Sequence, residues 1–428
     1  MLSLSSKGST SHEDDLVLEN SSASVVASNC DLLKQILLCV PMKPLMLFKC
    51  VSTSWLSLFS DPLFVQSYTL RNHRLSNRGL FLHKMSMGGV DPKFEFVFAD
   101  GRSFTGTMPF QTSFPKESTF VITEQSCNGL ICCSSGSRED RDSRIFYIFN
   151  PTTSQYRILP SSPSREEGSI VRNVSLAFDL LKSPHYQVVC FLISMEKCIF
   201  QIDIYSSKTA SWRRSGEGFS NKPFLLTKSG VFWNGSLHWV HVTEYPHVSL
   251  KDSFVYFDVD QELLMDMPVP EIPDGKVWDK EKIGYFGECK GHLHLIPNYD
   301  EYDGHFYIFE MEDIHYKQWS LKYKVNLEEV LIAYPKTFFD NERICEENEL
   351  GLYQHLYGYK FSIFLVEEEE GGESLNILIH IPDKIISYDL KNMSFKETHD
   401  LPSSLYHTGP AQAILCGAHQ HSESLACI

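Results

Sequence analysis

The strongest constraint on this sequence is a pattern of strand-like segments that returns about every fifty residues. Five segments share one layout, in which apolar and aromatic residues lead to a polar residue and a large apolar residue follows six positions later. The polar residues are Asn150, Ser206, Asp258, Glu310 and Asp389, and the large apolar residues are Tyr156, Trp212, Leu264, Tyr316 and Phe395. Successive polar residues are 56, 52, 52 and 79 residues apart, and the last interval contains a Glu-rich insert.

A glycine-led element precedes three of these segments. Gly129, Gly235 and Gly291 each begin an apolar stretch, 19 to 23 residues before the polar residue of their segment. Asn and Asp at the polar position favour a turn, because their side chains bond the local backbone. The predicted unit is therefore a strand, a turn, a second strand with a polar bend, and an aromatic or apolar residue that starts the next strand.

Strand-built repeats of about 50 residues are typical of kelch-type propeller blades. Each blade is a four-stranded sheet that buries its faces only against neighbouring blades. Five blades are visible and residues 79–120 fit a degraded sixth, so the predicted blade number is five or six. We expect a strand from the far end of the sequence to close the ring, with Ala411–Cys416 as the candidate. A pair of two-sheet β-sandwiches is the alternative fold.

Residues 31–72 follow a helical pattern instead. Apolar residues at helical spacing from Leu32 to Val40 predict a first helix, which Pro41 ends because it lacks an N–H. Two further helices follow, and Asp61 predicts the cap of a short fourth turn. Helices this short are marginal alone. The segment carries more apolar surface than it can bury against itself, which predicts a binding module.

These residues resemble the F-box, most closely its plant version. The matching stretches are Val40-Pro41, Lys43-Pro44-Leu45, Lys49 to Trp55 and Ser60 to Phe64. Two positions depart from the family pattern, because Ser28-Asn29 stands where Leu-Pro often opens the motif and Pro44 replaces a serine. The resemblance implies binding to a Skp-family adaptor and, through it, to a cullin. The residues expected to bind the adaptor are Leu32, Leu33, Ile36, Leu37, Pro41, Leu45, Cys50, Val51 and Trp55.

The rest of the sequence resembles the F-box-associated region of plant F-box proteins. The matching stretches are Cys127 to Leu130, Phe149 to Thr153, Ala177 to Asp179, Gly235 to Trp239 and Ser422 to Leu425. Together the resemblances imply an α+β multidomain chain, with a small N-terminal three-helix F-box followed by a large all-β kelch-like propeller. The expected domains are a disordered tail at residues 1–28, an F-box at 29–72 and a β-propeller-like substrate-recognition domain at 79–428.

Composition excludes several classes of protein. A net charge of −16 argues against a nucleic-acid partner. No apolar run approaches the roughly 20 residues of a membrane span, and the first residues show no signal pattern. The twelve cysteines include no Cys-x-x-Cys pair, so we interpret them as free thiols in a reducing compartment. The expected location is cytoplasmic, nuclear or both.

The sequence contains no recognisable catalytic signature, and we predict no catalytic residue, cofactor or metal. Cys416, His419 and His421 could ligate a metal, as could the pair His292 and His294, but strand histidines are more often structural. Aromatic residues on loops of a rigid scaffold are binding candidates. We therefore expect target contacts from three residues, with packing beneath a loop as the alternative role. They are Trp278, Tyr299 and Tyr302.

These patterns and resemblances predict a substrate-recognition subunit of a Skp–cullin–F-box ubiquitin ligase. The chain would hold a target protein near the ubiquitin-charged enzyme and supply no reacting group, so it would act through proximity. Two alternatives remain open. One is a propeller scaffold that works outside ubiquitination, and the other is an enzyme that uses the axial mouth of the propeller. The sequence does not identify the target protein.

Overall fold

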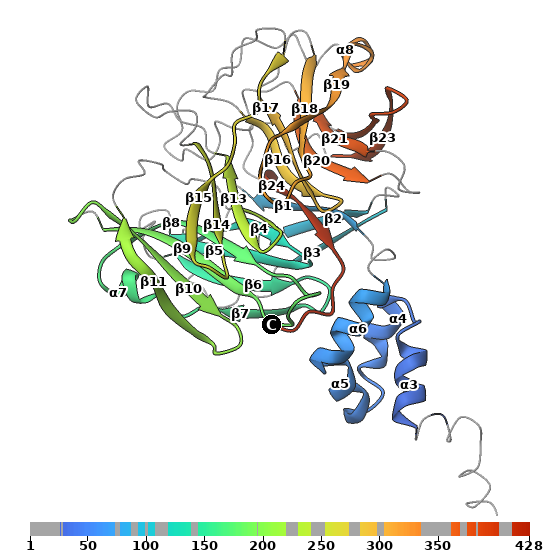
Figure 1. Ribbon diagram of the computed structural model, residues 1–428. Helices are drawn as coiled ribbons and strands as arrows, with labels where there is room; N and C mark the ends of the chain where they lie inside the picture. Colours follow the sequence, from blue (N-terminus) through green and yellow to red (C-terminus); the bar gives the residue numbers. More distant parts are fainter. Residues whose placement is uncertain are drawn as a thin grey trace, which may run out of the picture. The chain divides into compact units, whose positions relative to one another are not determined.

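The computed structural model divides the chain into two compact units, Met1–Ser76 and Asn77–Ile428. Each unit is described by itself (Figure 1). The described residues are 26, 29–72, 78–86, 93–98, 102–107, 119–137, 144–194, 196–219, 230–240, 253–273, 283–297, 304–334, 361–368, 375–381, 384–401 and 413–428. The predicted disordered tail, apart from Val26, lies outside the described residues.

The first unit contains four helices among its described residues. They are α3 (Cys30–Leu37), α4 (Met42–Phe48), α5 (Thr53–Phe59) and α6 (Pro62–Asn72). Side-chain caps begin two of them, since Asn29 Oδ1 accepts the N–H of Leu32 at 3.0 Å and Ser52 Oγ accepts that of Trp55 at 3.2 Å. The prediction of only a short turn after Asp61 is wrong. The helix continues for 11 residues and buries Phe64, Val65 and Tyr68, which lie on one side of α6.

The helices share a small apolar core. Leu37, Leu45, Phe59 and Phe64 are each at most 1% exposed. Hydrogen bonds tie the last helix to the residues that follow α3, because Tyr68 donates its hydroxyl to Val40 O at 2.8 Å and Asn72 donates Nδ2 to Leu38 O at 2.9 Å. The unit therefore has both a core and specific contacts between distant helices.

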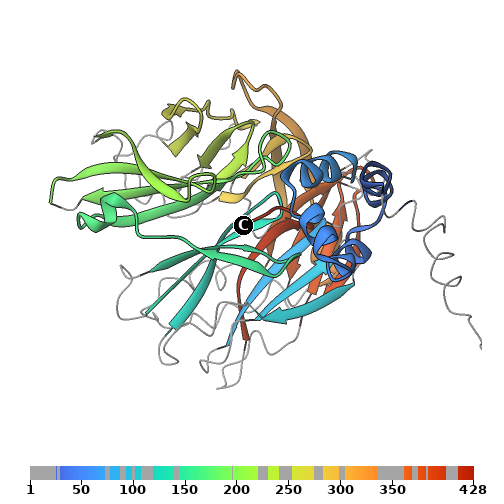
Figure 2. The same ribbon diagram turned by 90° about the horizontal axis from the view of Figure 1, so that it is seen from below.

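The second unit consists of six antiparallel four-stranded sheets in its described part. Blade 1 is β24 (Ala413–Ser422), β1 (Arg78–Ser86), β2 (Lys93–Phe98) and β3 (Ser103–Thr107); blade 2 is β4 (Thr119–Cys127), β5 (Leu130–Ser137), β6 (Ile145–Asn150) and β7 (Gln155–Ile158); blade 3 is β8 (Ile170–Ala177), β9 (Gln187–Ser194), β10 (Ile199–Ser206) and β11 (Ser211–Phe219). Blade 4 is β12 (Val231–Trp233), β13 (Ser236–Val240), β14 (Phe254–Asp258) and β15 (Leu263–Asp266); blade 5 is β16 (Ile283–Cys289), β17 (His292–Pro297), β18 (His305–Met311) and β19 (Ser320–Asn326); blade 6 is β20 (Ser362–Glu368), β21 (Leu375–Ile381), β22 (Lys384–Asp389) and β23 (Ser394–Asp400). Two short helices, α7 (Pro163–Glu166) and α8 (Glu328–Ala333), lie in connections between blades. The sheets follow one another around the domain in chain order, from blue through green and yellow to red (Figure 2).

A strand from the far end of the sequence closes the ring, as predicted. β24 pairs antiparallel with β1, and Phe81 stands opposite His419 while Leu82 stands opposite Ala418. Red β24 accordingly lies beside blue β1 in Figure 1. The bounds of the predicted strand, Ala411–Cys416, were too early, because the strand continues through the polar stretch to Ser422. The closed ring of six blades replaces the β-sandwich alternative.

Two kinds of tight turn produce the repeat. The hairpins between the first and second strands of blades 2, 4 and 5 place two consecutive residues at positive φ, as a two-residue hairpin with native twist requires. These pairs are Asn128-Gly129, Asn234-Gly235 and Lys290-Gly291. Between the third and fourth strands, Asp258 Oδ1 accepts the N–H groups of Asp260 and Gln261 at 3.0 and 2.8 Å. Asp389 and Asn150 close their turns in the same way.

Blade 5 departs from the predicted spacing. Its fourth strand starts at Ser320, so Tyr316 lies before the strand rather than in it. Trp319 takes the structural place of Trp212, because Trp319 donates Nε1–H to Pro268 O at 2.8 Å and Trp212 donates to Pro160 O at 2.7 Å. The longer turn in blade 5 explains the mismatch.

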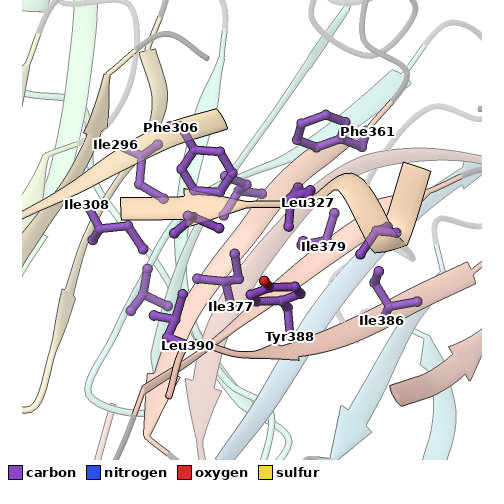
Figure 3. Packing of buried hydrophobic residues seen from close by; sticks show 14 of the residues in the cluster. Ile296, Phe306, Ile308, Leu327, Phe361, Ile377, Ile379, Ile386, Tyr388 and Leu390 are labelled. Carbon is purple, nitrogen blue, oxygen red and sulfur yellow. The ribbon is translucent and has the colours of Figure 1, made fainter. Parts of the chain in front are cut away.

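The cores of the propeller lie between adjacent blades. Figure 3 shows the cluster between blades 5 and 6, where Ile296 and Ile308 pack against Ile377 and Tyr388. The Tyr388 hydroxyl donates to Asn326 O at 2.9 Å, so the buried ring keeps its polar atom satisfied. Burial on both faces explains why the strands read as nearly continuous apolar runs.

Candidate functional site

The helical unit exposes an unusual number of large apolar side chains for its size. Leu47 is 73% exposed, Leu63 66%, Val51 60% and Leu70 59%. Leu32, Ile36 and Leu56 are each more than two-fifths exposed as well. Six of these seven residues lie on the four helices and Val51 lies between α4 and α5, so this exposed apolar surface is the candidate site for binding another protein.

The predicted adaptor-binding residues divide into two groups. Leu32, Ile36, Pro41, Cys50 and Val51 are exposed. Leu33, Leu37 and Leu45 are buried in the core of the unit, and Trp55 is partly buried.

The geometry of α3 explains this division. Neighbouring residues of a helix point about 100° apart, so Leu33 and Leu37 turn inward while Leu32 and Ile36 turn outward. The apolar stripe of the sequence is thus wider than the face that the other helices cover. Adaptor binding stays a prediction for all nine residues, of which the exposed group lies at the surface of the unit.

Sequence reasoning missed four exposed apolar residues, which are Leu47, Leu56, Leu63 and Leu70. Leu63 and Leu70 are seven residues apart on α6 and so share one face of that helix. Their spacing was a signal, because the inward face of α6 is already supplied by Phe64, Val65 and Tyr68.

Trp55 belongs to a row of aromatic rings that runs through the unit. Its centroid lies 5.5 Å from that of Phe48 and 6.2 Å from that of Phe59, both edge to face. Phe59 in turn contacts Phe64 at 5.5 Å. The indole therefore connects the partly exposed side of α4 with the core.

The two ends of the propeller blades differ in the length of their connections. Connections at the turn end include the two-residue hairpins after β4, β12 and β16 and the four-residue turns after β6, β10, β14 and β22. At the opposite loop end, connections include residues 267–282 and 327–361. The predicted target contacts Trp278, Tyr299 and Tyr302 lie outside the described residues. Their role stays a prediction.

His294, considered above as a metal ligand, binds a carboxylate. His294 Nε2 lies 2.9 Å from Glu310 Oε2, and Lys322 Nζ donates to Glu310 Oε1 at 2.9 Å. Burial raises the pKa of Glu310, but hydrogen bonds from His294 and Lys322 outweigh it and hold that pKa well below its usual range. His292 lies at the edge of the same cluster, with Nδ1 3.5 Å from Glu310. The cluster is an ion-pair network between strands β17, β18 and β19.

The other considered metal group lies in the closing strand. The side chain of Cys416 is outside the described residues. Burial lowers the pKa of His419 to about 4 and that of His421 to about 3. The His421 ring packs edge to face on Phe96 at 5.4 Å. Within the described ranges, no three His, Cys, Asp or Glu residues are arranged to hold a metal ion.

Four buried cysteines have thiols of low reactivity. Burial raises the pKa of Cys127 to about 12 and raises those of Cys132, Cys133 and Cys190 further. A thiol with a raised pKa stays protonated and is a poor nucleophile. These residues serve as small apolar core side chains.

No helix in the described part of the chain is long and apolar enough to cross a membrane.

Comparison with known families identifies the second unit. Residues 91–371 match the F-box associated beta propeller domain. The chain belongs to this family. F-box protein At5g07610 of Arabidopsis thaliana is 30% identical over 404 residues, which cover 90% of this chain and 88% of that protein. F-box protein At5g49610 of the same plant is 25% identical over 305 residues, covering 68% of this chain and 74% of that protein.

A third relative from Arabidopsis thaliana is F-box/kelch-repeat protein At3g23880. It is 23% identical over 257 residues, which cover 56% of this chain and 65% of that protein. The chain is therefore an F-box-associated propeller protein with plant relatives that are named F-box proteins. The matched residues extend from β2 to β20, and the helical unit precedes them.

Proposed function

We propose that this F-box-associated propeller protein is the substrate-recognition subunit of a Skp–cullin–F-box ubiquitin ligase. The observation that carries the proposal is the exposed apolar surface of the helical unit, on a chain whose relatives are named F-box proteins. A surface of leucine, isoleucine and valine side chains fits an apolar groove of a partner protein. In this proposal residues 29–72 are the F-box and the partner is a Skp-family adaptor.

The structure suggests separate roles for the predicted adaptor-binding residues. Leu32, Ile36 and Val51 would enter the groove, because they are already exposed. Leu33 and Leu37 would hold α3 in place, because they are buried.

Neither departure from the family pattern disturbs the helices. Pro44 stands in the first turn of α4, where its missing N–H removes no helical hydrogen bond. Asn29 caps α3 through its side chain, which is a role that proline could not fill.

The propeller would recognise the target protein. Trp278, Tyr299 and Tyr302 stay the predicted contacts, because each falls in a stretch of sequence that joins two strands of the rigid blades. The chain would raise the effective concentration of acceptor lysines near the ubiquitin-charged enzyme and contribute no reacting group. The ligase function, its cullin and the cytoplasmic or nuclear location are parts of this proposal.

Pull-down of a Skp-family adaptor by the full chain tests the proposal. We expect the pair Leu32→Asp and Ile36→Asp to abolish binding, because charges at exposed groove contacts are desolvated without a partner. Gln35→Asp is the matched control, since Gln35 is exposed and polar on the same helix. Adaptor binding that survives the pair would contradict an F-box at residues 29–72.

Co-purification of a cullin separates the ligase from a scaffold that works outside ubiquitination. Affinity purification with the proteasome blocked would then identify the target. Loss of that target, with the adaptor retained, is the expected result for Trp278→Ala combined with Tyr299→Ala and Tyr302→Ala. Retention of the target by this variant would remove these residues from the proposed recognition surface.

A further inference from the structure

The residues after the closing strand continue across a neighbouring blade. We name residues 423–428 the strap. Ser424, Leu425 and Ala426 are 6%, 2% and 0% exposed, although no strand includes them. The segment lies against blade 2, at the turn end of the propeller. Its burial requires partners for its backbone polar groups.

Blade 2 supplies those partners with side chains. Asn150 Nδ2 donates to Ser424 O at 3.1 Å and to Ala426 O at 2.8 Å. Thr152 Oγ1 accepts the N–H of Ser424 at 3.0 Å, and Arg157 Nη2 donates to Ile428 O at 3.0 Å. All four bonds reach main-chain atoms of the strap. Hydrogen bonds to the main chain are a common means of holding a peptide segment, and the buried Leu425 side chain between them adds apolar contact.

A comparison of repeated positions isolates the role of Asn150. Asp258 and Asp389 occupy the same place in blades 4 and 6, and their carboxylates accept the same two turn N–H groups. Asn150 Oδ1 does this too, at 2.9 and 3.3 Å. A carboxylate would serve the turn of blade 2 equally well, but it has no N–H to donate. Only the amide can close the turn and bind the carbonyl groups of the strap.

Gly129 is a second residue of blade 2 that the strap approaches closely. A Cβ on Gly129 would lie 2.2 Å from Cβ of Ser424 and 2.9 Å from Ser422 O. The corresponding Gly291 of blade 5 would meet nothing within 4 Å. Both glycines have positive φ, so the hairpin alone does not explain the close approach at Gly129. The surface of blade 2 is shaped to admit a peptide backbone.

We propose that blade 2 carries a peptide-binding site that the chain's own strap occupies, and that this site accepts the same residues when they are supplied as a separate peptide. The ligand is a segment with the chemistry of residues 423–428: two carbonyl groups at alternate residues for Asn150, and a leucine between them. The proposal is independent of the ligase function, since it concerns the turn end and none of the residues assigned to the adaptor or the target.

A chain that ends at Ser422, combined with a synthetic peptide of residues 423–428 under reducing conditions, tests the site. We expect the shortened chain to have a lower Tm than the full chain, and the peptide to restore the Tm in a saturable manner. A peptide with aspartate in place of Leu425 should restore nothing. The shortened chain carrying Asn150→Asp should not respond to the native peptide. An unchanged Tm on shortening, or an equal response of the Asn150→Asp chain, overturns the proposal.

Full-length variants keep the proposal testable if the shortened chain does not fold. Asn150→Asp and Leu425→Asp should each lower the Tm, and the double variant should be no less stable than the worse single variant, because either change releases the strap. Asp258→Asn is the matched control. We expect it to leave the Tm unchanged, because the amide oxygen of asparagine can accept the turn N–H that Asp258 accepts. Additive losses in the double variant would show that Asn150 and the strap do not act together.

Discussion

Tyr316 of blade 5 donates its hydroxyl to Nε2 of His238 in blade 4, with 2.7 Å between the two atoms. Nδ1 of the same ring lies 3.1 Å from Val231 O, and a carbonyl can only accept, so the ring proton belongs on Nδ1. The two blades are thus joined through one tautomer of a neutral histidine. Burial lowers the pKa of His238 to about 3, which keeps the ring in this state.

Replacement of Tyr316 by phenylalanine should destabilise the propeller. The change leaves His238 Nε2 buried without a donor, which costs about 1–3 kcal/mol of unfolding free energy. Urea unfolding of the full chain measures the loss. Tyr334→Phe is the control, because the Tyr334 hydroxyl bonds to Glu397 on the surface and water replaces it. Equal losses of unfolding free energy for both variants would show that the hydrogen bond between the blades contributes no more to stability than a surface hydrogen bond does.

Acid should weaken the fold through buried histidines. Burial lowers the pKa values of His83, His238 and His421 from 6.5 to about 3. The unfolded chain therefore takes up protons first as the pH falls. Stability from the neutral rings is complete above pH 6.5 and is lost on the way down to about pH 3. Each ring contributes up to about 1.4 kcal/mol per pH unit within this range.

Urea midpoints measured just above pH 6.5 and about one unit below it check this expectation. His238→Asn should reduce the pH dependence of the unfolding free energy by the contribution of one buried histidine. A midpoint that does not change between the two conditions would contradict neutral burial of these rings.

Loss of Lys322 should cost more than loss of an ordinary surface lysine. Lys322 Nζ donates to buried Glu310, and Lys322→Met leaves that carboxylate with histidine partners alone. Because Lys322 is itself 40% exposed, water screens part of the effect, and we expect about 1–2 kcal/mol. Lys317→Met is the control, since Lys317 is 75% exposed and pairs with Asp313 at 3.3 Å. Equal losses of unfolding free energy for the two variants in chemical denaturation would contradict the interpretation that Lys322 stabilises buried Glu310.

Adjacent residues of α3 should separate folding from binding. Leu37 is 1% exposed, and Leu37→Ala should destabilise the helical unit by about 2–5 kcal/mol. Ile36 is 45% exposed, so Ile36→Ala should leave the unit folded and weaken adaptor binding. Limited proteolysis of residues 29–72 reports the first effect, and adaptor pull-down reports the second. A protease-sensitive Ile36→Ala variant would place Ile36 in the core instead.

Alanine substitutions at the equivalent residues Gly129 and Gly291 should reveal the stability contributed by the contact between Gly129 and the strap. Gly129→Ala and Gly291→Ala both place a side chain at positive φ, which costs about 1 kcal/mol each. Gly129→Ala must also displace Ser424, so its loss of thermal stability should be clearly larger. Removal of residues 423–428 should then reduce the difference between the two losses, leaving only the contact of Gly129 with Ser422 O. A difference that does not shrink without the strap would have another cause.

The sequence by itself determined the parts of this protein that depend on neighbouring residues. Asn or Asp followed by its own turn, and Asn-Gly at a hairpin, act over a few residues, so the repeat and the blade period could be read directly. The stop at Pro41 and the cap at Asp61 are local in the same way, because each depends only on the residues beside it.

Only the tertiary structure decided what depends on residues far apart. Leu33 and Leu32 look alike in the sequence, and the packing of α3 alone makes one buried and the other exposed. Because the turn of blade 5 is longer, Trp319 takes the place at the fourth strand that the sequence spacing had predicted for Tyr316. The pairing of strands outweighs local spacing here. The second task of Asn150 depends on Ser424 and Ala426, more than 270 residues away. Local chemistry specifies turns and caps, whereas burial between distant segments selects which side chains face inward and which remain to bind.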